Sequence, residues 1–132
     1  MKFLFDNSLS PDLAKGLREL RRPYSEEIIH LKEKFAEDVK DPEYLGALIS
    51  EGGWSVVSAD RFKKSTAERK AIMNPNIHVF VLSKGFGKLP YWSKTKAMVR
   101  QWGDISKLAD LTRGGLWEVR AQGKITPYTP GH

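Results

Sequence analysis

The apolar residues of the chain fall into short continuous runs separated by segments with helical spacing. The runs predict buried strands at residues 2–5, 27–31, 54–59 and 77–82. Between and after them, apolar residues recur every three to four positions, which predicts helices at residues 11–22, 42–51, 65–73 and 92–112. A last segment, residues 116–125, predicts a final strand or hairpin arm.

Two of these helices carry a start signal. Ser10 is a good N-cap and Pro11 suits the first helical position, and Asp41 with Pro42 repeats that pair. Gly103 lies inside the last helical pattern and weakens the prediction of one unbroken helix there.

The alternation of strands and helices predicts the fold class. It is typical of an α/β fold with a mostly parallel sheet covered by helices. A length of 132 residues fits one domain, residues 1–132, that buries a core without disulfides. Residues 126–132 are expected to form a loose tail.

Charge narrows the range of partners. Lys and Arg number 22 against 16 Asp and Glu, a net charge of +6 that favours a polyanion such as RNA, although a basic surface also serves solubility. Residues 61–70 and 84–100 are basic, whereas residues 33–43 gather acids, which suggests a cation site inside a basic rim. The chain lacks cysteine and its N-terminal apolar run is too short for a signal peptide or a membrane span, so we expect a cytoplasmic protein without a membrane partner.

Three acids stand where a metal site is expected. Asp6 and Asp60 each follow a predicted strand, and ligands of open parallel sheets bind at the carboxyl ends of the strands. Asp41 starts a predicted helix whose first turn also offers Glu43. Converging carboxylates repel each other unless a cation neutralises them, and Mg²⁺ and Mn²⁺ prefer oxygen ligands. Such a site can activate water against a phosphodiester.

Each acid also has a simpler interpretation. Asp41 can serve only as a helix cap, and Asp6 can form a turn with the residues that follow it. Asp60 can form a turn or an ion pair with Arg61. The metal hypothesis therefore depends on the three acids as a set.

Polar and basic residues beside these acids are candidates for RNA contact, with turn formation or a solvated loop as the alternative. They are Asn7, Arg61, Lys63, Lys64 and Lys84. His30 and His78 lie in predicted strands and are expected to be packed histidines. Trp92 and Trp102 are expected to lie in the core or in a dimer interface.

Four segments resemble the PIN-like families of bacterial toxin–antitoxin operons, the VapC-related and Mut7-C-like groups. The segments are MKFLFDNSLSP (1–11), HLKE (30–33), DPEYL (41–45) and SADR (58–61). The resemblance implies a three-layer α/β/α PIN-like domain and a ribonuclease toxin that uses Mg²⁺ or Mn²⁺. It implies Asp6, Asp41 and Asp60 as catalytic metal ligands with Glu43 as an addition, a cognate antitoxin protein as partner, and a homodimer. A further acid is expected beyond the third strand, but residues 83–88, after the fourth strand, contain none.

Two other functions stay open. The chain can be a non-enzymatic module that keeps the PIN-like shape and binds RNA or a protein. It can also be a phosphotransfer receiver domain, but receivers usually present paired acids near the first strand, and Asp6 is single.

Overall fold

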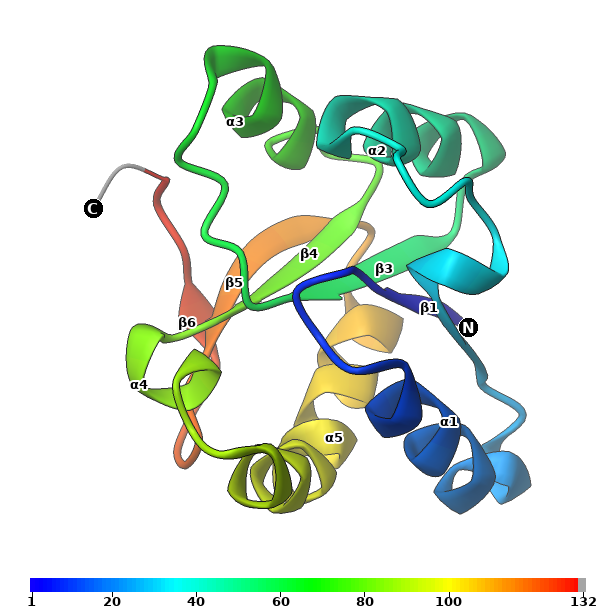
Figure 1. Ribbon diagram of the computed structural model, residues 1–132, viewed down its shortest axis with the longest axis vertical. Coiled ribbons are helices and arrows are strands. Elements are labelled where there is room, and N and C mark those ends of the chain that lie inside the picture. Colours follow the sequence, from blue (N-terminus) through cyan, green and yellow to red (C-terminus); the bar gives the residue numbers. More distant parts are fainter. Residues whose placement is uncertain (131–132) are drawn as a thin grey trace.

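The computed structural model describes residues 1–130, in which strands and helices alternate along most of the chain (Figure 1). The strands are β1 (Lys2–Phe5), β2 (Glu27–His30), β3 (Trp54–Ser58), β4 (His78–Leu82), β5 (Gly115–Val119) and β6 (Thr126–Pro127). The helices are α1 (Pro11–Leu20), α2 (Asp41–Glu51), α3 (Thr66–Ile72), α4 (Lys84–Gly87) and α5 (Tyr91–Leu111). Two 3-10 turns, η1 (Arg22–Tyr24) and η2 (Leu31–Glu33), flank β2.

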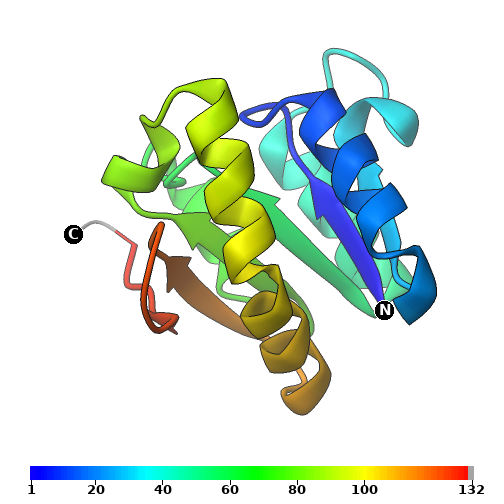
Figure 2. The same ribbon diagram turned by 90° about the horizontal axis from the view of Figure 1, so that it is seen from below.

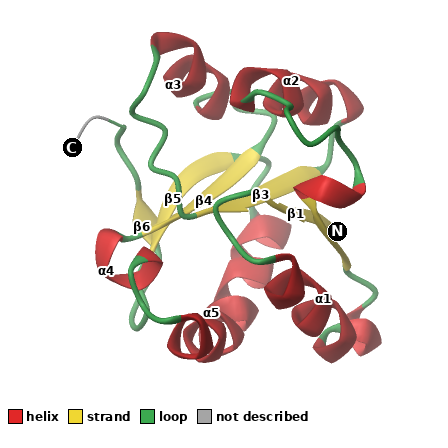
Figure 3. Ribbon diagram, in the orientation of Figure 1, coloured by secondary structure: helices red, strands yellow, loops and turns green. Residues whose placement is uncertain are grey.

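The strands form one sheet between two helical layers. Their order is β2-β1-β3-β4-β5-β6, and every neighbouring pair is parallel except β5 and β6. Helices α1 and α5 cover one face, and α2 and α3 cover the other (Figures 2 and 3). The predicted α/β class with a mostly parallel sheet is therefore confirmed.

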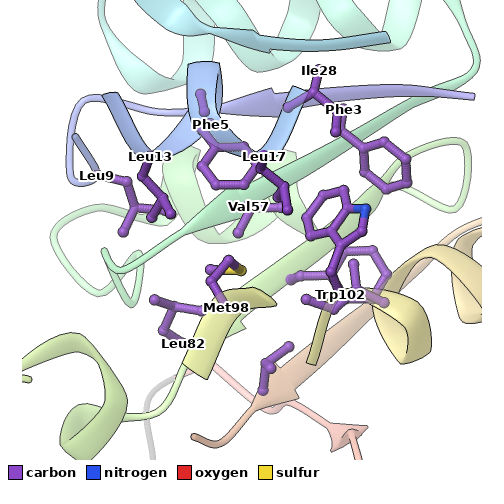
Figure 4. Close-up of a cluster of buried hydrophobic side chains, with 14 of the residues drawn as sticks. Phe3, Phe5, Leu9, Leu13, Leu17, Ile28, Val57, Leu82, Met98 and Trp102 are labelled. Atoms are coloured by element: carbon purple, nitrogen blue, oxygen red, sulfur yellow. The ribbon is translucent and has the colours of Figure 1, made fainter. Parts of the chain in front are cut away.

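Successive side chains of β1 enter opposite layers of the fold. Phe3 and Phe5 enter the layer of α1 and α5, where their ring centroids lie 4.7 and 5.7 Å from that of Trp102 (Figure 4). Leu4 enters the layer of α2 and α3 and belongs to the same buried cluster as Tyr44. Burial on both faces explains why the central strands read as continuous apolar runs.

The helix starts agree with the sequence in one case and differ in the other. The Ser10 hydroxyl accepts a hydrogen bond from the Asp12 amide at 3.1 Å, as expected of an N-cap. Asp41 is not the N-cap of α2, contrary to the prediction. The Lys40 carbonyl already accepts the first helical bond, from the Tyr44 amide at 3.1 Å, so Asp41 is the first helical residue and its carboxylate caps nothing.

The last third of the chain differs from the sequence-based expectation in two places. Helix α5 runs unbroken through Gly103, because this glycine is exposed while the buried face of the helix continues past it. Trp102 is buried as expected, whereas Trp92 is 65% exposed and does not lie in the core, so its place in a dimer interface stays a prediction. The predicted loose tail is also wrong for residues 126–128, since β6 pairs with β5 and the amide of buried Tyr128 donates to the Leu116 carbonyl. The last two residues of that tail, 131–132, lie outside the described residues.

Membrane insertion was not expected from the sequence. Over residues 1–130, no helix combines the length and the apolar character needed to cross a bilayer.

Candidate functional site

Asp6 reaches the carboxyl edge of the sheet beside the end of β3. The register pairs Phe5 with Val57, and the Asp6 amide extends it by donating to the Val57 carbonyl at 3.2 Å. Because side chains alternate along a strand, Asp6 and Ser58 both point into the layer of α2 and α3. The Asp6 side chain is buried there, with 3% exposure of the residue.

Hydroxyl groups surround the Asp6 carboxylate. Oδ2 accepts from the Ser58 hydroxyl at 2.5 Å and from the Tyr44 hydroxyl at 3.3 Å. Oδ1 accepts from the Ser8 amide at 3.0 Å and from the Ser8 hydroxyl. Burial raises the pKa of Asp6, the serine hydrogen bonds offset this only in part, and the charge of Asp60 raises it further. None of the ion pairs among residues 1–130 includes Asp6.

The charges of three other acids act on the carboxylate of Asp41. It lies half-buried in the first turn of α2, where a helix N-terminus favours negative charge. Burial and the charges of Asp60, Asp6 and Glu68 nevertheless raise the pKa of Asp41 to about 7. The structure therefore brings the three acids predicted from the sequence into one negative field.

Asp60 is fixed by backbone contacts. Its Oδ1 accepts from the Phe62 amide at 2.9 Å, which closes a turn. The Asp60 amide donates to the Ser58 hydroxyl at 2.9 Å, and that hydroxyl in turn donates to Asp6. Two of the acids are thus linked through Ser58.

Glu68 is the acid that the sequence reasoning missed. It lies in the first turn of α3, is 8% exposed, and its Oε2 atom is buried without a hydrogen-bond partner among residues 1–130. A signal was present, because Ser65 followed three residues later by Glu68 is a helix-start pattern. A helix that follows a strand begins at the carboxyl edge of the sheet, so an acid in its first turn lies near that edge. The fourth acid thus comes from α3, before β4, and not from the segment after β4.

The remaining candidates lie around these acids. Glu43 is exposed and is not among the main contributors to the shift at Asp41, so the structure does not bring it into the acid group. The exposed RNA-contact candidates follow β1, β3 and β4 at the same edge: Asn7, Lys63, Lys64 and Lys84. Helix α4 lies beside this edge, since a Cβ at Gly87 would stand 3.6 Å from Cβ of Ala59.

Arg61 has a structural environment of its own. Its NH2 donates to Glu118 Oε2 at 2.7 Å and its NH1 to the Leu82 carbonyl at 3.0 Å, and the side chain is 17% exposed. Its guanidinium carbon also lies 4.8 Å from the ring centroid of Tyr128. Arg61 therefore pairs with Glu118 and not with Asp60, the alternative considered from the sequence, and its charge is not free for RNA, contrary to the prediction.

The chemistry of the acid group fits a hard divalent cation. Within residues 1–130 no three acidic, histidine or cysteine side chains stand close enough together to hold a metal ion as they are placed. The group nevertheless offers only oxygen donors, a buried Glu68 oxygen without a partner, and a mutual repulsion that a bound cation would relieve.

Comparison with known proteins places the fold in a family. A family model described as a PIN-like domain matches residues 1–84. No curated protein and no solved structure matches the chain. The matched segment contains β1 to β4, α1 to α3 and all four acids, whereas α5, β5 and β6 lie beyond it. Since the match covers more than half of the sequence, the chain belongs to the family of PIN-like domains.

Proposed function

We propose that this PIN-like domain is an Mg²⁺- or Mn²⁺-dependent ribonuclease. PIN-like domains are typically nucleases, so membership in the family makes this the first hypothesis. The observation that carries it is the field at Asp41, whose pKa is raised to about 7 by burial and by Asp60, Asp6 and Glu68. A fold keeps such unneutralised acids together most readily when a cation is part of its working state.

The residues divide into ligands and orienting groups. Asp6, Asp41, Asp60 and Glu68 would hold the cation, which supplies the Lewis-acid chemistry that phosphodiester hydrolysis needs. The hydroxyls of Ser8, Ser58 and Tyr44 orient the Asp6 carboxylate.

Exposed basic residues complete the site on its outer side. Lys63 and Lys64 follow Asp60, and Lys84 follows β4 at the same edge. Their charges would orient the RNA backbone at the acids without reading its sequence.

The toxin role is the finer part of the proposal. The resemblance of residues 1–11 and 41–45 to PIN-like toxins supports it, together with a cognate antitoxin and a homodimer. Expression of the wild type in bacteria should then arrest growth, and expression of Asp60→Asn should not. Arrest by both proteins would separate growth inhibition from the acids.

Cleavage of a mixed RNA pool with Mn²⁺ tests the nuclease directly. Asp60→Asn should lower the cleavage rate about 100-fold or more, because it removes a ligand to an ion worth several kcal/mol in the transition state. Asp38→Asn is the matched control, since Asp38 is an exposed loop acid that precedes α2. Chelation of the metal should stop RNA cleavage by the wild type and by Asp38→Asn. Equal cleavage by wild type and Asp60→Asn, or cleavage that survives chelation, would refute the proposal.

A catalytically weak module that binds RNA or a protein is the second candidate. Its support is that both Asp6 oxygens already accept hydroxyl hydrogen bonds and that no three acids are gathered for a metal within residues 1–130. Binding of labelled RNA, followed by fluorescence anisotropy, distinguishes the two. If the chain is such a module, its affinity for RNA or for a protein should be the same with and without chelator, and the same in the wild type and in Asp60→Asn. It should not cleave RNA.

A further inference from the structure

The loop that carries Asp60 is held in a conformation that its own backbone does not favour. Residues 59–65 join β3 to α3 without regular structure. Within this loop Phe62 adopts a left-handed backbone with φ of 53°, which costs about 1 kcal/mol or more for a residue with a side chain. The bond from the Phe62 amide to Asp60 Oδ1 closes this turn locally, and contacts from elsewhere in the fold add to its stability.

The loop finds those contacts in the C-terminal hairpin, residues 115–128, which comprises β5, β6 and Tyr128. Glu118 of β5 pairs with the Arg61 guanidinium at 2.7 Å, and both side chains are 17% exposed. Glu118 Oε1 also lies 3.4 Å from the guanidinium of Arg120, which is 50% exposed, so Arg61 is the less exposed of the two arginines that Glu118 pairs with. Loss of Glu118 would leave the mostly buried Arg61 guanidinium without its carboxylate.

Tyr128 makes a second, independent connection. Its hydroxyl donates to the Arg61 carbonyl at 2.8 Å, so it fixes the backbone directly after Asp60. Its ring lies under the Arg61 guanidinium and shares a buried cluster with Phe62 and Ile72. Side chain and backbone of Arg61 are thus both attached to the hairpin.

We propose that the C-terminal hairpin positions Asp60 within the acid group, with Tyr128 and Glu118 as positioning residues that act through Arg61. The hairpin lies outside the segment matched by the family model, so this part of the site is contributed by the chain beyond residue 84. The holding of the loop is independent of the proposed nuclease activity, while its consequence for cation binding rests on that proposal.

Amide hydrogen exchange followed by NMR tests the holding of the loop. In Tyr128→Phe the exchange of the Asp60 and Phe62 amides should accelerate about threefold to tenfold, because this factor corresponds to the net free energy of one hydrogen bond. Amides of β3 and β4 should keep their rates, which a general loss of stability would not allow. Tyr24→Phe is the matched control, because the Tyr24 ring also stacks on an arginine, with 3.8 Å to the Arg21 guanidinium carbon, at the opposite edge of the sheet.

Glu118→Gln and a Mn²⁺ titration complete the design. Glu118→Gln should accelerate the same two amides, and both variants should weaken Mn²⁺ binding about threefold or more, as misplacement of one ligand predicts. Unchanged exchange at Asp60 and Phe62 in both variants would overturn the proposal, as would faster exchange with unaltered Mn²⁺ affinity. A wild type that binds no Mn²⁺ would instead refute the nuclease proposal, and the exchange rates would still decide whether the hairpin holds the loop.

Discussion

Two buried carboxylates at opposite edges of the sheet differ in their hydrogen-bond donors and in the direction of their pKa shifts. Glu26, just before β2, accepts from Arg21 Nε at 2.7 Å and NH2 at 2.9 Å, from Trp102 Nε1 at 3.0 Å and from the Ser106 hydroxyl. Burial alone would raise the pKa of Glu26, but these bonds outweigh it and lower the pKa. Asp6, just after β1, has only hydroxyl and amide donors, and its pKa is raised.

The difference separates a structural acid from a candidate functional one. Glu26 carries its own counter-ion and is complete within the fold, so it joins α5 to the start of β2. Asp6 and its acidic neighbours are held in place without an ion pair among residues 1–130, so their neutralisation must come from protons or from a cation outside the chain.

The largest expected effect is at the structural acid. Glu26→Ala should lower the free energy of unfolding by about 3 kcal/mol, because it leaves the Arg21 guanidinium and the Trp102 indole N–H partly buried without a partner. Asp6→Asn should cost much less, because it removes a charge that its neighbours repel. Urea unfolding measures both values. Equal losses in the two variants would contradict the distinction between the acids.

The next effect is stabilisation by a divalent cation. At a Mn²⁺ concentration 100 times the dissociation constant, the folded wild type should gain about 2.7 kcal/mol, seen as a rise in Tm. Asp41→Asn should lose most of this gain and Asp38→Asn should keep it. A wild-type Tm that does not change with Mn²⁺ would show that the site does not bind this cation.

A smaller effect is the dependence of stability on pH without metal. Folded Asp41 holds its proton up to a pKa of about 7, whereas the unfolded chain releases it near 3.8, so the folded state binds more protons in this window. Stability should therefore fall as pH rises from 4 to 7, by on the order of 1 kcal/mol after solvent screening of this half-buried group.

The difference between wild type and Asp41→Asn isolates that contribution. His78 acts in the opposite direction, because burial lowers its pKa and stability is lost as pH falls through 6.5, but it cancels in the difference. Parallel pH profiles of the two proteins, from thermal unfolding, would show that Asp41 is not perturbed by its neighbours.

The smallest effect is at the hydroxyl cage of Asp6. Tyr44→Phe removes a long hydrogen bond of 3.3 Å and should cost about 0.5 kcal/mol, measured by urea unfolding. It should also raise the pKa of Asp6 further, measured by NMR titration of the carboxyl group. A loss as large as that of Glu26→Ala would make Tyr44 a structural partner comparable to Arg21.

Local patterns of the sequence were sufficient for the fold and for the placement of Asp6. The apolar runs gave the central strands within one residue at most ends, and Ser10 with Pro11 gave the start of α1. The position of Asp6 and Asp60 at one edge of the sheet also followed, because parallel strands end at the same edge.

Features that depend on distant partners could not be read from local patterns. Nothing near Arg61 shows that its partner is Glu118, 57 positions away, and nothing near Tyr128 shows that it folds back onto the loop after β3. Glu68 was overlooked because residues 65–73 were interpreted only as a helix, without asking at which edge of the sheet that helix begins. The sequence did not decide between the core and a dimer interface for Trp92, because hydrophobicity alone does not tell which face of α5 meets the sheet.

The position of Trp102 has a consequence for synthesis of the chain. This residue packs on Phe3 and Phe5 and bonds to Glu26, yet it lies 18 positions beyond the end of the matched segment at residue 84. A nascent chain on the ribosome cannot complete the packing of those two phenylalanines until residue 102 has left the exit tunnel. The acids at positions 6 to 68 are therefore translated early and assembled late, when α5 closes over the first strand.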